Sequence, residues 1–419
     1  MNVSHAEVLV LGAGLQGIGI ALELARRDIP VTVVERDPLP LNRASLRNEG
    51  KIHLGLIYAH DRSLDTAFLQ LDGALRFRAL VTRWIGDEAG WLVRSTPFHY
   101  LVAHDSLLPP ERLAEHYAAV EEGCRWRLSR DPGLDYLGTR PERLTRPLRD
   151  TEIAAHFDPA RITAGFASAE LAIDTAVLAD ALRRFLPRDS SIRLLPSHDV
   201  RTLGEVPGGF RAEGDSPDGP WQIHARQVVN ATWERRLGLD RQLGLEPPPD
   251  LLHRLKYRVI ARLPERLRRA PSVTMVLGRY GDVVVRADGT AYLSWYPSGL
   301  QGWSHDIEPP AAWDAPCRGE VPAEFAREVA GGIIAGIDAW YPGMVRAEPL
   351  LVDAGAIVAI GRSDVDDAAS GLHDRSRIGV FTNGAYHSVD PGKLTTAPMF
   401  AVETADRVEA LRTAATGAR

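Results

Sequence analysis

Cysteine is scarce in this sequence: only Cys124 and Cys317 occur among 419 residues. Two isolated cysteines are too few for a disulfide framework, a zinc cluster or a Cys-x-x-Cys redox site, and they suit a reducing cytoplasm. No run of eighteen apolar residues is present, which argues against a membrane-spanning helix. The N-terminus also lacks the basic, apolar and small-residue order of a signal peptide. We therefore expect a cytoplasmic protein without a membrane span.

The sequence has no excess of basic residues either. It carries 49 Lys and Arg against 55 Asp and Glu, a formal net charge of −6, so a nucleic-acid partner is not expected. Apolar residues make up 45% and charged residues 25%, which is typical of a globular protein and not of a collagen-like, coiled-coil or disordered chain. At roughly 150 residues per domain, the length predicts two to three domains.

The first forty residues contain a strand, a glycine-rich turn, a helix and a second strand. Residues 7–11 form a short run rich in Val and Leu that predicts a buried parallel strand. Gly12-Ala-Gly-Leu-Gln-Gly17 follows directly, and residues 18–27 have the apolar spacing of a helix. Residues 31–34 predict the second strand, which ends at Glu35. This order within about thirty residues is typical of a dinucleotide-binding βαβ unit.

Each part of this unit has a physical role. Gly12 permits the tight turn, Gly14 lets a pyrophosphate approach the backbone, and Gly17 lets the helix pack close to the strand. The helix N-terminus offers free N–H groups and a partial positive charge to the phosphates. Glu35, 35 − 14 = 21 residues after the second glycine, can accept hydrogen bonds from a ribose diol. The cofactor-binding residues predicted from this unit are Gly12, Gly14, Leu15, Gln16, Gly17, Glu35 and Arg36.

The motif alone fits FAD and NAD alike, and residues 45–58 decide between them. They read Ser-Leu-Arg-Asn-Glu-Gly-Lys-Ile-His-Leu-Gly-Leu-Ile-Tyr, where a nicotinamide dehydrogenase would usually run on into another helix and strand. Here the chain resembles the D-amino-acid oxidase superfamily of FAD enzymes, and within it the branch of L-2-hydroxyglutarate oxidases and FAD-dependent glycerol-3-phosphate dehydrogenases. Members carry Asn-x-Gly-x-Ile-His-x-Gly or Ser-x-Arg-x-x-x-x-Ile-His-x-Gly-x-x-Tyr at this place. The matching residues are Ser45, Arg47, Asn48, Gly50, Ile52, His53, Gly55 and Tyr58.

The resemblance implies that this loop crosses the flavin, with Ser45 near the pyrophosphate and the backbone of residues 51–53 along the isoalloxazine ring. Some relatives attach FAD covalently through a histidine in this region, so His53 is a candidate tether, a candidate catalytic group or a structural imidazole beside the cofactor. Tyr58 is a second candidate catalytic residue. A linkage through a C-terminal cysteine is excluded, because the chain has none there. This loop adds to the predicted cofactor site Ser45, Asn48, Gly50, Lys51, Ile52 and His53.

The middle of the chain resembles the family at its adenosine contacts. Strands are predicted at 199–203 and 227–232. In the family a valine in the first strand contacts the adenine, and an Ala-Thr-Gly at the end of the second approaches the ADP. The resemblance therefore adds Val200, Ala231 and Thr232 to the cofactor site, while Trp233 stands where glycine is usual.

Residues 257–296 predict four antiparallel strands without crossover helices, which favours a separate sheet. The resemblance makes this sheet the substrate domain, with one face over the flavin. Tyr257, Tyr292 and Tyr296 either line the substrate pocket or are ordinary packing residues.

The C-terminal part resembles the family again. Gly392-Lys-Leu-Thr-Thr396 precedes a helix predicted at 397–411, and FAD-linked glycerol-3-phosphate dehydrogenases have a similar Gly-Lys-x-Thr-Thr. A helix N-terminus aimed at N1 and O2 of the flavin, together with Lys393, stabilises the negative charge that forms when flavin takes a hydride. The cofactor residues predicted here are Gly361, Gly384, Tyr386, His387, Gly392, Lys393, Leu394 and Thr395.

His387 and Arg362 complete the candidate catalytic set with His53 and Tyr58. His387 can act as a general base for an alcohol or as a hydrogen-bond donor to substrate, and its alternative is a structural imidazole. Arg362 can clamp a carboxylate or phosphate, and its alternative is a salt bridge at the surface or between domains. The segment before the last helix lacks the Gly-Asp pair usual in aromatic hydroxylases, which disfavours a monooxygenase. No metal site is expected.

Together these features predict an α/β protein. We expect a discontinuous Rossmann-like FAD-binding domain (1–90, 151–235 and 350–412), an inserted antiparallel-sheet substrate domain (91–150 and 236–349) and a flexible tail (413–419). The expected activity is that of an FAD-dependent oxidoreductase, oxidase or dehydrogenase. It removes a hydride from a C–H next to a hydroxyl, which is slightly favoured, or an amine of a small polar substrate. Oxygen or another acceptor then reoxidises the flavin. The alternatives are an amino-acid or amino-sugar oxidase of the same fold and, from a different class, an NAD-dependent Rossmann dehydrogenase.

Overall fold

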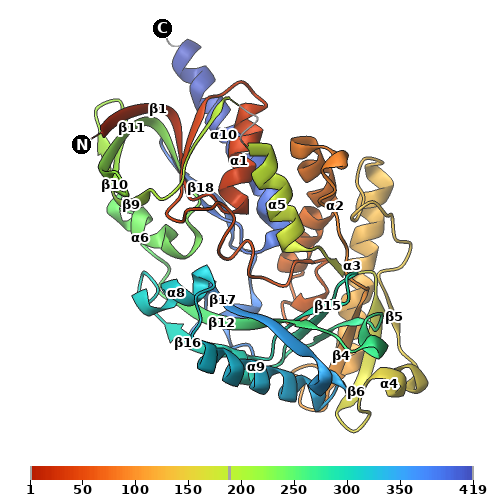
Figure 1. The fold of residues 1–419 in the computed structure, drawn as a ribbon. Coiled ribbons are helices and arrows are strands. Elements are labelled where there is room, and N and C mark those ends of the chain that lie inside the picture. Colours follow the sequence, from red (N-terminus) through yellow and green to blue (C-terminus); the bar gives the residue numbers. More distant parts are fainter. Residues whose placement is uncertain (1, 187–189, 418–419) are drawn as a thin grey trace.

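The computed structural model describes residues 2–186 and 190–417, and in this part of the chain two large β-sheets are flanked by helices (Figure 1). The first sheet has the order β18-β19-β11-β1-β2-β8, with β9 and β10 added to β11 as an antiparallel meander. The strands from β19 to β8 run parallel to one another. The bounds are β1 (Asn2–Leu11), β2 (Val31–Val34), β8 (Ile192–Leu195), β9 (Asp199–Val206), β10 (Gly209–Ser216), β11 (Gly219–Asn230), β18 (Gly379–Asn383) and β19 (Tyr386–Asp390).

Both ends of the chain help to build this first layer. Helix α1 (Leu15–Ala25) is buried along its whole length and packs against α2 (Asp65–Ile85) and α10 (Ala397–Gly417). Residues 8–11 of β1 have no exposed surface, as a parallel strand covered on both faces requires. The strand, turn, helix and strand expected near the N-terminus are therefore present, and the C-terminal helix lies beside them.

The second sheet is mainly antiparallel and has the order β16-β12-β15-β14-β13-β4-β6-β5, with β17 on the other side of β12. Helix α9 (Ala323–Asp338) covers one face, packing on β12 and β17 through Val329, Ile333 and Ile337, which are spaced four residues apart. The bounds are β4 (Phe98–Ala103), β5 (Thr145–Pro147), β6 (Ile162–Ser168), β12 (Leu251–Arg262), β13 (Ser272–Met275), β14 (Asp282–Val285), β15 (Thr290–Leu293), β16 (Leu300–Ser304) and β17 (Glu348–Ile360). The α/β fold with a second, antiparallel sheet is thus confirmed.

Shorter elements join the two layers. The two-stranded pair of β3 (Lys51–Ile52) with β7 (Leu171–Ala172) ties the loop after β2 to the chain that returns from β6. The remaining helices are α3 (Pro110–Arg130), α4 (Asp150–His156), α5 (Thr175–Phe185), α6 (Arg236–Gln242), α7 (Tyr296–Gly299) and α8 (Asp314–Arg318). None of the helices in the described residues is long and apolar enough to cross a membrane.

The strand pairing differs from the domain boundaries that the sequence predicts. Strands β6 and β17 belong to the second sheet, although the sequence predicts residues 151–235 and 350–412 to be part of the FAD-binding domain. The chain passes from one layer to the other directly before or after each of these strands. The residue pattern of a strand does not show to which sheet the strand belongs, so the sequence does not reveal the boundary. Helix α10 extends to Gly417, into the range predicted as a flexible tail (413–419), and residues 418–419 lie outside the described part.

Candidate active site

One continuous cavity runs between the two sheets. At one end it is lined by the carboxyl ends of β1, β2 and β11, where Gly12, Glu35 and Ala231 lie. Side chains and backbone from two segments, 41–60 and 391–397, line the cavity between its ends, and the second sheet closes the other end through Arg254 and Lys256 of β12. Ligand sites of open parallel sheets lie at this carboxyl edge.

The turn after β1 is packed so closely that a Cβ would crowd neighbouring atoms at its glycine positions. Gly12 has φ +92°, and a Cβ there would lie 2.8 Å from the carbonyl oxygen of Ala231. A Cβ at Gly17 would lie 1.9 Å from the carbonyl oxygen of Gly12, and one at Gly14 would lie 3.1 Å from Ser45 Oγ. The N–H of Leu15, at the start of α1, donates to Ser45 Oγ at 2.8 Å. Backbone at a helix N-terminus therefore meets the cavity without intervening side chains, as a pyrophosphate requires.

Glu35 ends β2 at the same place. Its carboxylate accepts hydrogen bonds from the N–H groups of Ala13 (2.7 Å) and Asp37 (2.9 Å). Burial raises the pKa of Glu35, and these two backbone donors oppose that rise. Held in this way at the cavity wall, Glu35 is positioned to accept ribose hydroxyls.

Trp233 keeps the backbone shape that glycine usually supplies. Its φ is +54°, in the left-handed region, and its indole Nε1 donates to the carbonyl of Ala356 at 2.9 Å. Val200, Ala231 and Thr232 line the cavity around it, at the end predicted for the adenosine. The side chain is therefore tied to β17, while the backbone still turns in the way the family pattern implies.

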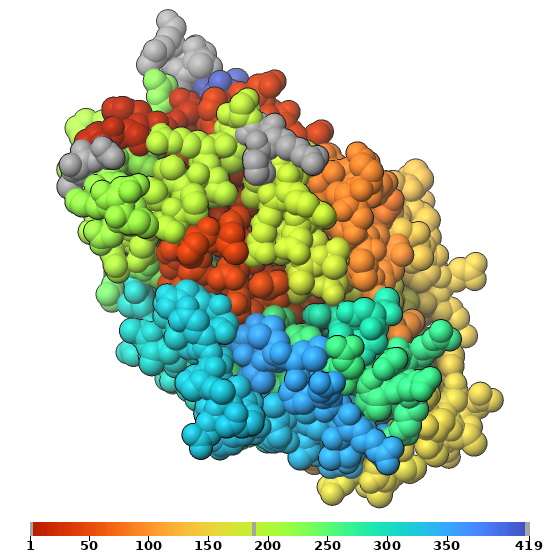
Figure 2. Space-filling view, viewed as in Figure 1, coloured from red at the N-terminus to blue at the C-terminus, as the bar shows by residue number. Residues whose placement is uncertain are grey.

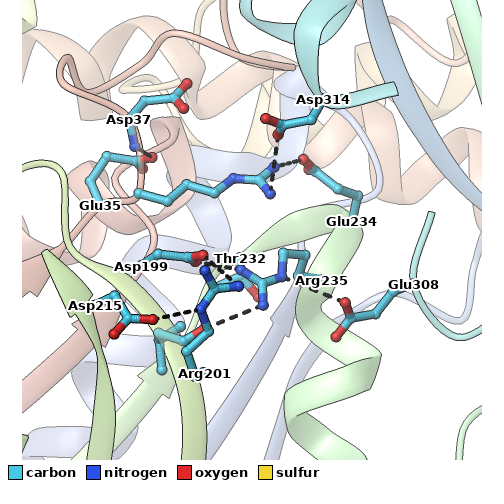
Figure 3. A network of polar contacts seen from close by, with 12 residues as sticks. Glu35, Asp37, Asp199, Arg201, Asp215, Thr232, Glu234, Arg235, Glu308 and Asp314 are labelled. Carbon is cyan, nitrogen blue, oxygen red and sulfur yellow. Dashed lines mark hydrogen bonds and ion pairs between the residues drawn. The ribbon is translucent and has the colours of Figure 1, made fainter. Parts of the chain in front are cut away.

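An ionic network surrounds this end of the cavity (Figure 3). Arg36 pairs with Glu234, and Arg43 lies 2.8 Å from Asp37 and 2.7 Å from Asp314. In a second cluster of the same network, Arg235 pairs with Asp199 at 2.5 Å and lies 3.8 Å from Glu308. Figure 2 shows the segment around α8, in cyan, meeting the red N-terminal part on this face of the molecule. The second domain thus reaches across to the dinucleotide end.

The C-terminal segment forms the wall at the end of the cavity where the resemblance places the flavin. Gly392, Lys393 and Leu394 line the cavity just before α10 begins at Ala397. The N–H of His53 donates to Thr395 Oγ1 at 2.9 Å, which fastens residues 45–58 to this segment. Lys393 Nζ lies 3.8 Å from a carboxylate oxygen of Glu49. Both sets of residues that the resemblance places around the ring therefore meet in space.

Three cationic side chains, Arg254, Lys256 and Arg375, line the far end of the cavity. Arg254 pairs with Asp364 at 3.0 Å, and Lys256 lies 3.9 Å from Asp282 and 4.7 Å from the ring centroid of Tyr296. Arg375 has no carboxylate within ion-pair distance among the described residues. Burial lowers the pKa of Arg375, and the nearby charge of Arg254 lowers it further. An anion in this space would remove that repulsion.

Sequence reasoning missed these cations and Glu49. A signal was present for Arg254 and Lys256, because charged residues stand at every second position from 254 to 258 and most residues between and around them are apolar. No local pattern marks Arg375, which lies in the irregular segment between β17 and β18. Among the described residues no group of His, Cys, Asp and Glu side chains is arranged to hold a metal ion.

Most predicted cofactor residues line the cavity, and so do His53 and Tyr58. The members that line it are Gly12, Gly14, Leu15, Gln16, Glu35, Arg36, Ser45, Asn48, Lys51, His53, Val200, Ala231, Thr232, Gly392, Lys393 and Leu394. The members that do not line it are Gly17, Gly50, Ile52, Gly361, Gly384, Tyr386, His387 and Thr395. Gly17, Gly50, Ile52 and Thr395 are close neighbours in the chain of residues that do.

His387 and Arg362 lie away from the cavity, which corrects their predicted contact with substrate. His387 is fully buried in β19, and its ring nitrogens lie 3.0 Å from Thr382 Oγ1 and 3.3 Å from Gln227 Oε1. Strand β19 continues to Asp390, so the chain reaches the cavity only at Pro391. The side chain of Arg362 is 82% exposed and pairs with Asp250 at 2.6 Å. His387 is therefore a structural imidazole, and Arg362 forms a surface salt bridge, which are the alternatives to a catalytic role.

Comparisons with known proteins agree with this geometry. A family described as FAD dependent oxidoreductase (DAO) matches residues 7–407. Glycine oxidase from Geobacillus kaustophilus is similar in structure, with TM-score 0.68 and 16% identity over 97% of this chain and 95% of that one. L-α-glycerophosphate oxidase from Mycoplasma pneumoniae has TM-score 0.62 and 17% identity over 98% and 95%. L-proline dehydrogenase from P. horikoshii has TM-score 0.63 and 17% identity over 98% and 94%.

No curated protein matches the sequence. The family match covers nearly the whole chain, and the glycine turn, Glu35 and the Gly392–Leu394 wall fit an extended dinucleotide between the sheets. An NAD-dependent dehydrogenase, the alternative from another class, is not the family that matches. The chain therefore belongs to the DAO family of FAD-dependent oxidoreductases, and FAD is its cofactor.

Proposed function

We propose that the protein oxidises the C–H next to a hydroxyl group in a small anionic substrate, and that oxygen or another acceptor then reoxidises the flavin. The observation that carries this proposal is the cationic end of the cavity. Arg254, Lys256 and Arg375 line it, and Arg375 has no carboxylate partner among the described residues. Buried cations of this kind favour a carboxylate or phosphate.

The residues around the cavity suit an alcohol because a proton acceptor is present. Oxidation of an alcohol releases a hydride and a proton, whereas a neutral amine can be oxidised without a protein base. Burial lowers the pKa of His53, although the neighbouring carboxylate of Glu49 opposes this, so the imidazole is neutral near pH 7. A neutral imidazole beside the cavity can serve as the final acceptor of the hydroxyl proton.

The chemistry that bound FAD supplies is acceptance of the hydride. Lys393 and the N-terminus of α10 place positive potential at the C-terminal wall, where the pyrimidine edge of the ring is expected. Arg254, Lys256 and Arg375 hold the anionic end of the substrate, which orients its C–H. Tyr58, buried and without a hydrogen-bond partner for its hydroxyl among the described residues, packs beside His53 with 5.8 Å between the ring centroids.

Anaerobic reduction of the purified yellow protein tests this proposal. The substrates are matched pairs that differ in one group: L-lactate and L-alanine, glycolate and glycine, and glycerol 3-phosphate and glycerol. We expect a hydroxylated anion to bleach the flavin at least about tenfold faster than its amine or uncharged counterpart. Faster bleaching by the amine of a pair would move the assignment to an amino-acid or amino-sugar oxidase of the same fold.

A further inference from the structure

His53 lines the cavity, but its two ring nitrogens are not exposed to it. Both are buried, and neither has a hydrogen-bond partner among the described residues. Nε2 lies 3.6 Å from Glu49 Oε1, and Nδ1 lies 3.8 Å from Glu170 Oε1. A substrate hydroxyl therefore does not reach the imidazole directly in this arrangement. One of the two carboxylates has to stand between them.

The carboxylate of Glu170 is already occupied. It has no exposed surface, and it accepts hydrogen bonds from the hydroxyl of Tyr100 and from the N–H of Leu54 (2.7 Å). These contacts make Glu170 a fixed structural group behind His53.

Glu49 lies on the other side of the imidazole and faces the cavity. It lines the cavity wall with 17% of its side chain exposed, and in the part of the chain that the structure describes its one cationic neighbour within 4 Å, apart from His53, is Lys393 Nζ at 3.8 Å. Glu49 is thus the group that faces both the substrate space and Nε2 of His53.

We propose that Glu49 is a catalytic residue that takes the proton of the substrate hydroxyl and passes it to Nε2 of His53. This inference rests on the proposed oxidation of an alcohol. The C–H bond breaks with its electron pair going to FAD as a hydride, the O–H bond breaks with its proton going to Glu49 and then to His53, and the substrate becomes a carbonyl compound. After the flavin is reoxidised, the proton leaves by the same carboxylate.

The charges around His53 favour this direction of transfer. The charged and titratable groups that face it are Glu49, Glu170, Lys51, Lys393 and Tyr58. Burial alone would raise the pKa of Glu49, but Lys393, His53 and Lys256 outweigh burial and hold that pKa well below its usual range. Glu49 is therefore ionised and ready to accept. The proton passes on because the pKa of Glu49 is held so low, and because Glu49 and Glu170 stabilise the imidazolium of His53 against the opposing effects of burial, Lys393 and Lys51.

The first test compares Glu49→Gln, Glu49→Asp and the exposed control Glu88→Gln in anaerobic flavin reduction. The probe is the hydroxylated member of the pairs above that reduces the wild-type flavin fastest. We expect Glu49→Gln to slow reduction by a factor of about 100 or more, with partial recovery in Glu49→Asp. The residual rate of Glu49→Gln should increase steadily with pH, because solvent base replaces the carboxylate. A rate within twofold of the wild type would overturn the proposal.

The second test needs no turnover. Nitrogen-15 NMR of the holoenzyme labelled at histidine, with His53→Asn to assign the signal, measures the pKa of His53. Because the carboxylate of Glu49 raises that pKa, Glu49→Gln should lower it, and an unchanged pKa would contradict the coupling. The two possible failures can be told apart. If no hydroxylated probe reduces the wild-type flavin, the proposed function fails. If the pKa of His53 is the same in Glu49→Gln as in the wild type, only the proton transfer from Glu49 to His53 is refuted.

Discussion

Arg43 and Asp314 form a 2.7 Å ion pair that joins the loop after β2 to the start of α8. Arg43 lines the dinucleotide end of the cavity, whereas Asp314 belongs to the segment between β16 and β17 of the second sheet. Arg36 lies 3.7 Å from the same carboxylate. Contacts made by the second domain therefore hold two arginines in the cavity wall, at the end where the dinucleotide is expected.

Loss of this pair should speed the release of FAD. Asp314→Asn removes the charge that holds Arg43 while keeping the shape. Because Asp314 is 37% exposed, we expect at most about 1 kcal/mol, or roughly a fivefold faster release. Flavin fluorescence after dilution measures the rate. The exposed Glu324→Gln on α9 serves as control and should release FAD as the wild type does. Equal release from Asp314→Asn would show that the pair does not hold the cofactor.

Gly14→Val should yield protein without FAD. A Cβ at this position lies 3.1 Å from Ser45 Oγ, and the two methyl groups beyond it enter the space beside the N-terminus of α1. The ratio of flavin absorbance to protein absorbance after purification measures the occupancy. In Gly331→Ala on α9, where nothing lies within 4 Å of the added Cβ, occupancy should stay full. A yellow, fully loaded Gly14→Val protein would remove Gly14 from the phosphate site.

The parts of the site that sequence predicts well are those made within one short segment. Gly12, Gly14 and Glu35 act within a single strand-turn-helix-strand unit, so their spacing in the chain already sets their positions in space. Residues 45–58 and 392–396 are more than 300 positions apart in the sequence, so their spacing in the chain does not predict that they meet. Their meeting at His53 and Thr395 was predictable only through the family resemblance.

The predictions that differ from the structure depend on contacts between distant segments. His387 is close to the cavity in sequence, but pairing with β11 fixes its strand, and Gln227 and Thr382 take up its ring nitrogens. Arg375 shows the opposite case. No motif in its own segment predicts a functional residue. Arg375 lines the cavity because the chain between β17 and β18 returns over the cavity near Arg254.

His387 should make the fold sensitive to acid. Burial, with a smaller contribution from Arg407, lowers the pKa of His387 from 6.5 to about 4. Between these values the unfolded chain binds the proton and the folded chain does not, so the free energy of unfolding falls as the pH falls. The expected loss from pH 7 to pH 5 is about 2 kcal/mol.

Urea unfolding of wild type and His387→Gln at pH 7 and pH 5 measures this contribution. The difference between the two pH values should shrink in His387→Gln and stay unchanged in the exposed control His5→Gln. Flavin reduction by His387→Gln should remain within about twofold of the wild type, since the ring does not reach the cavity. A large loss of reduction rate in a stably folded, flavin-loaded His387→Gln would return this residue to the site.

Arg375 should matter for substrate binding and act against stability. Its guanidinium has no carboxylate within ion-pair distance among the described residues, and burial and Arg254 both disfavour its charge. Arg375→Gln should therefore raise the KM for an anionic substrate by a factor of about 10 to 100. The same change should raise the midpoint of thermal unfolding, because it removes a repulsive charge.

The matched control is Arg377→Gln, an exposed arginine two residues away. It should alter neither the KM nor the midpoint of thermal unfolding. An uncharged analogue of the substrate separates binding of the anion from damage to the pocket, because Arg375→Gln should leave the KM for that analogue nearly unchanged. If the site holds an anion, Arg375→Gln should weaken substrate binding and at the same time raise the midpoint of thermal unfolding. A fall in both would mean that Arg375 supports the fold, and an unchanged KM would mean that the substrate carries no charge at this end of the cavity.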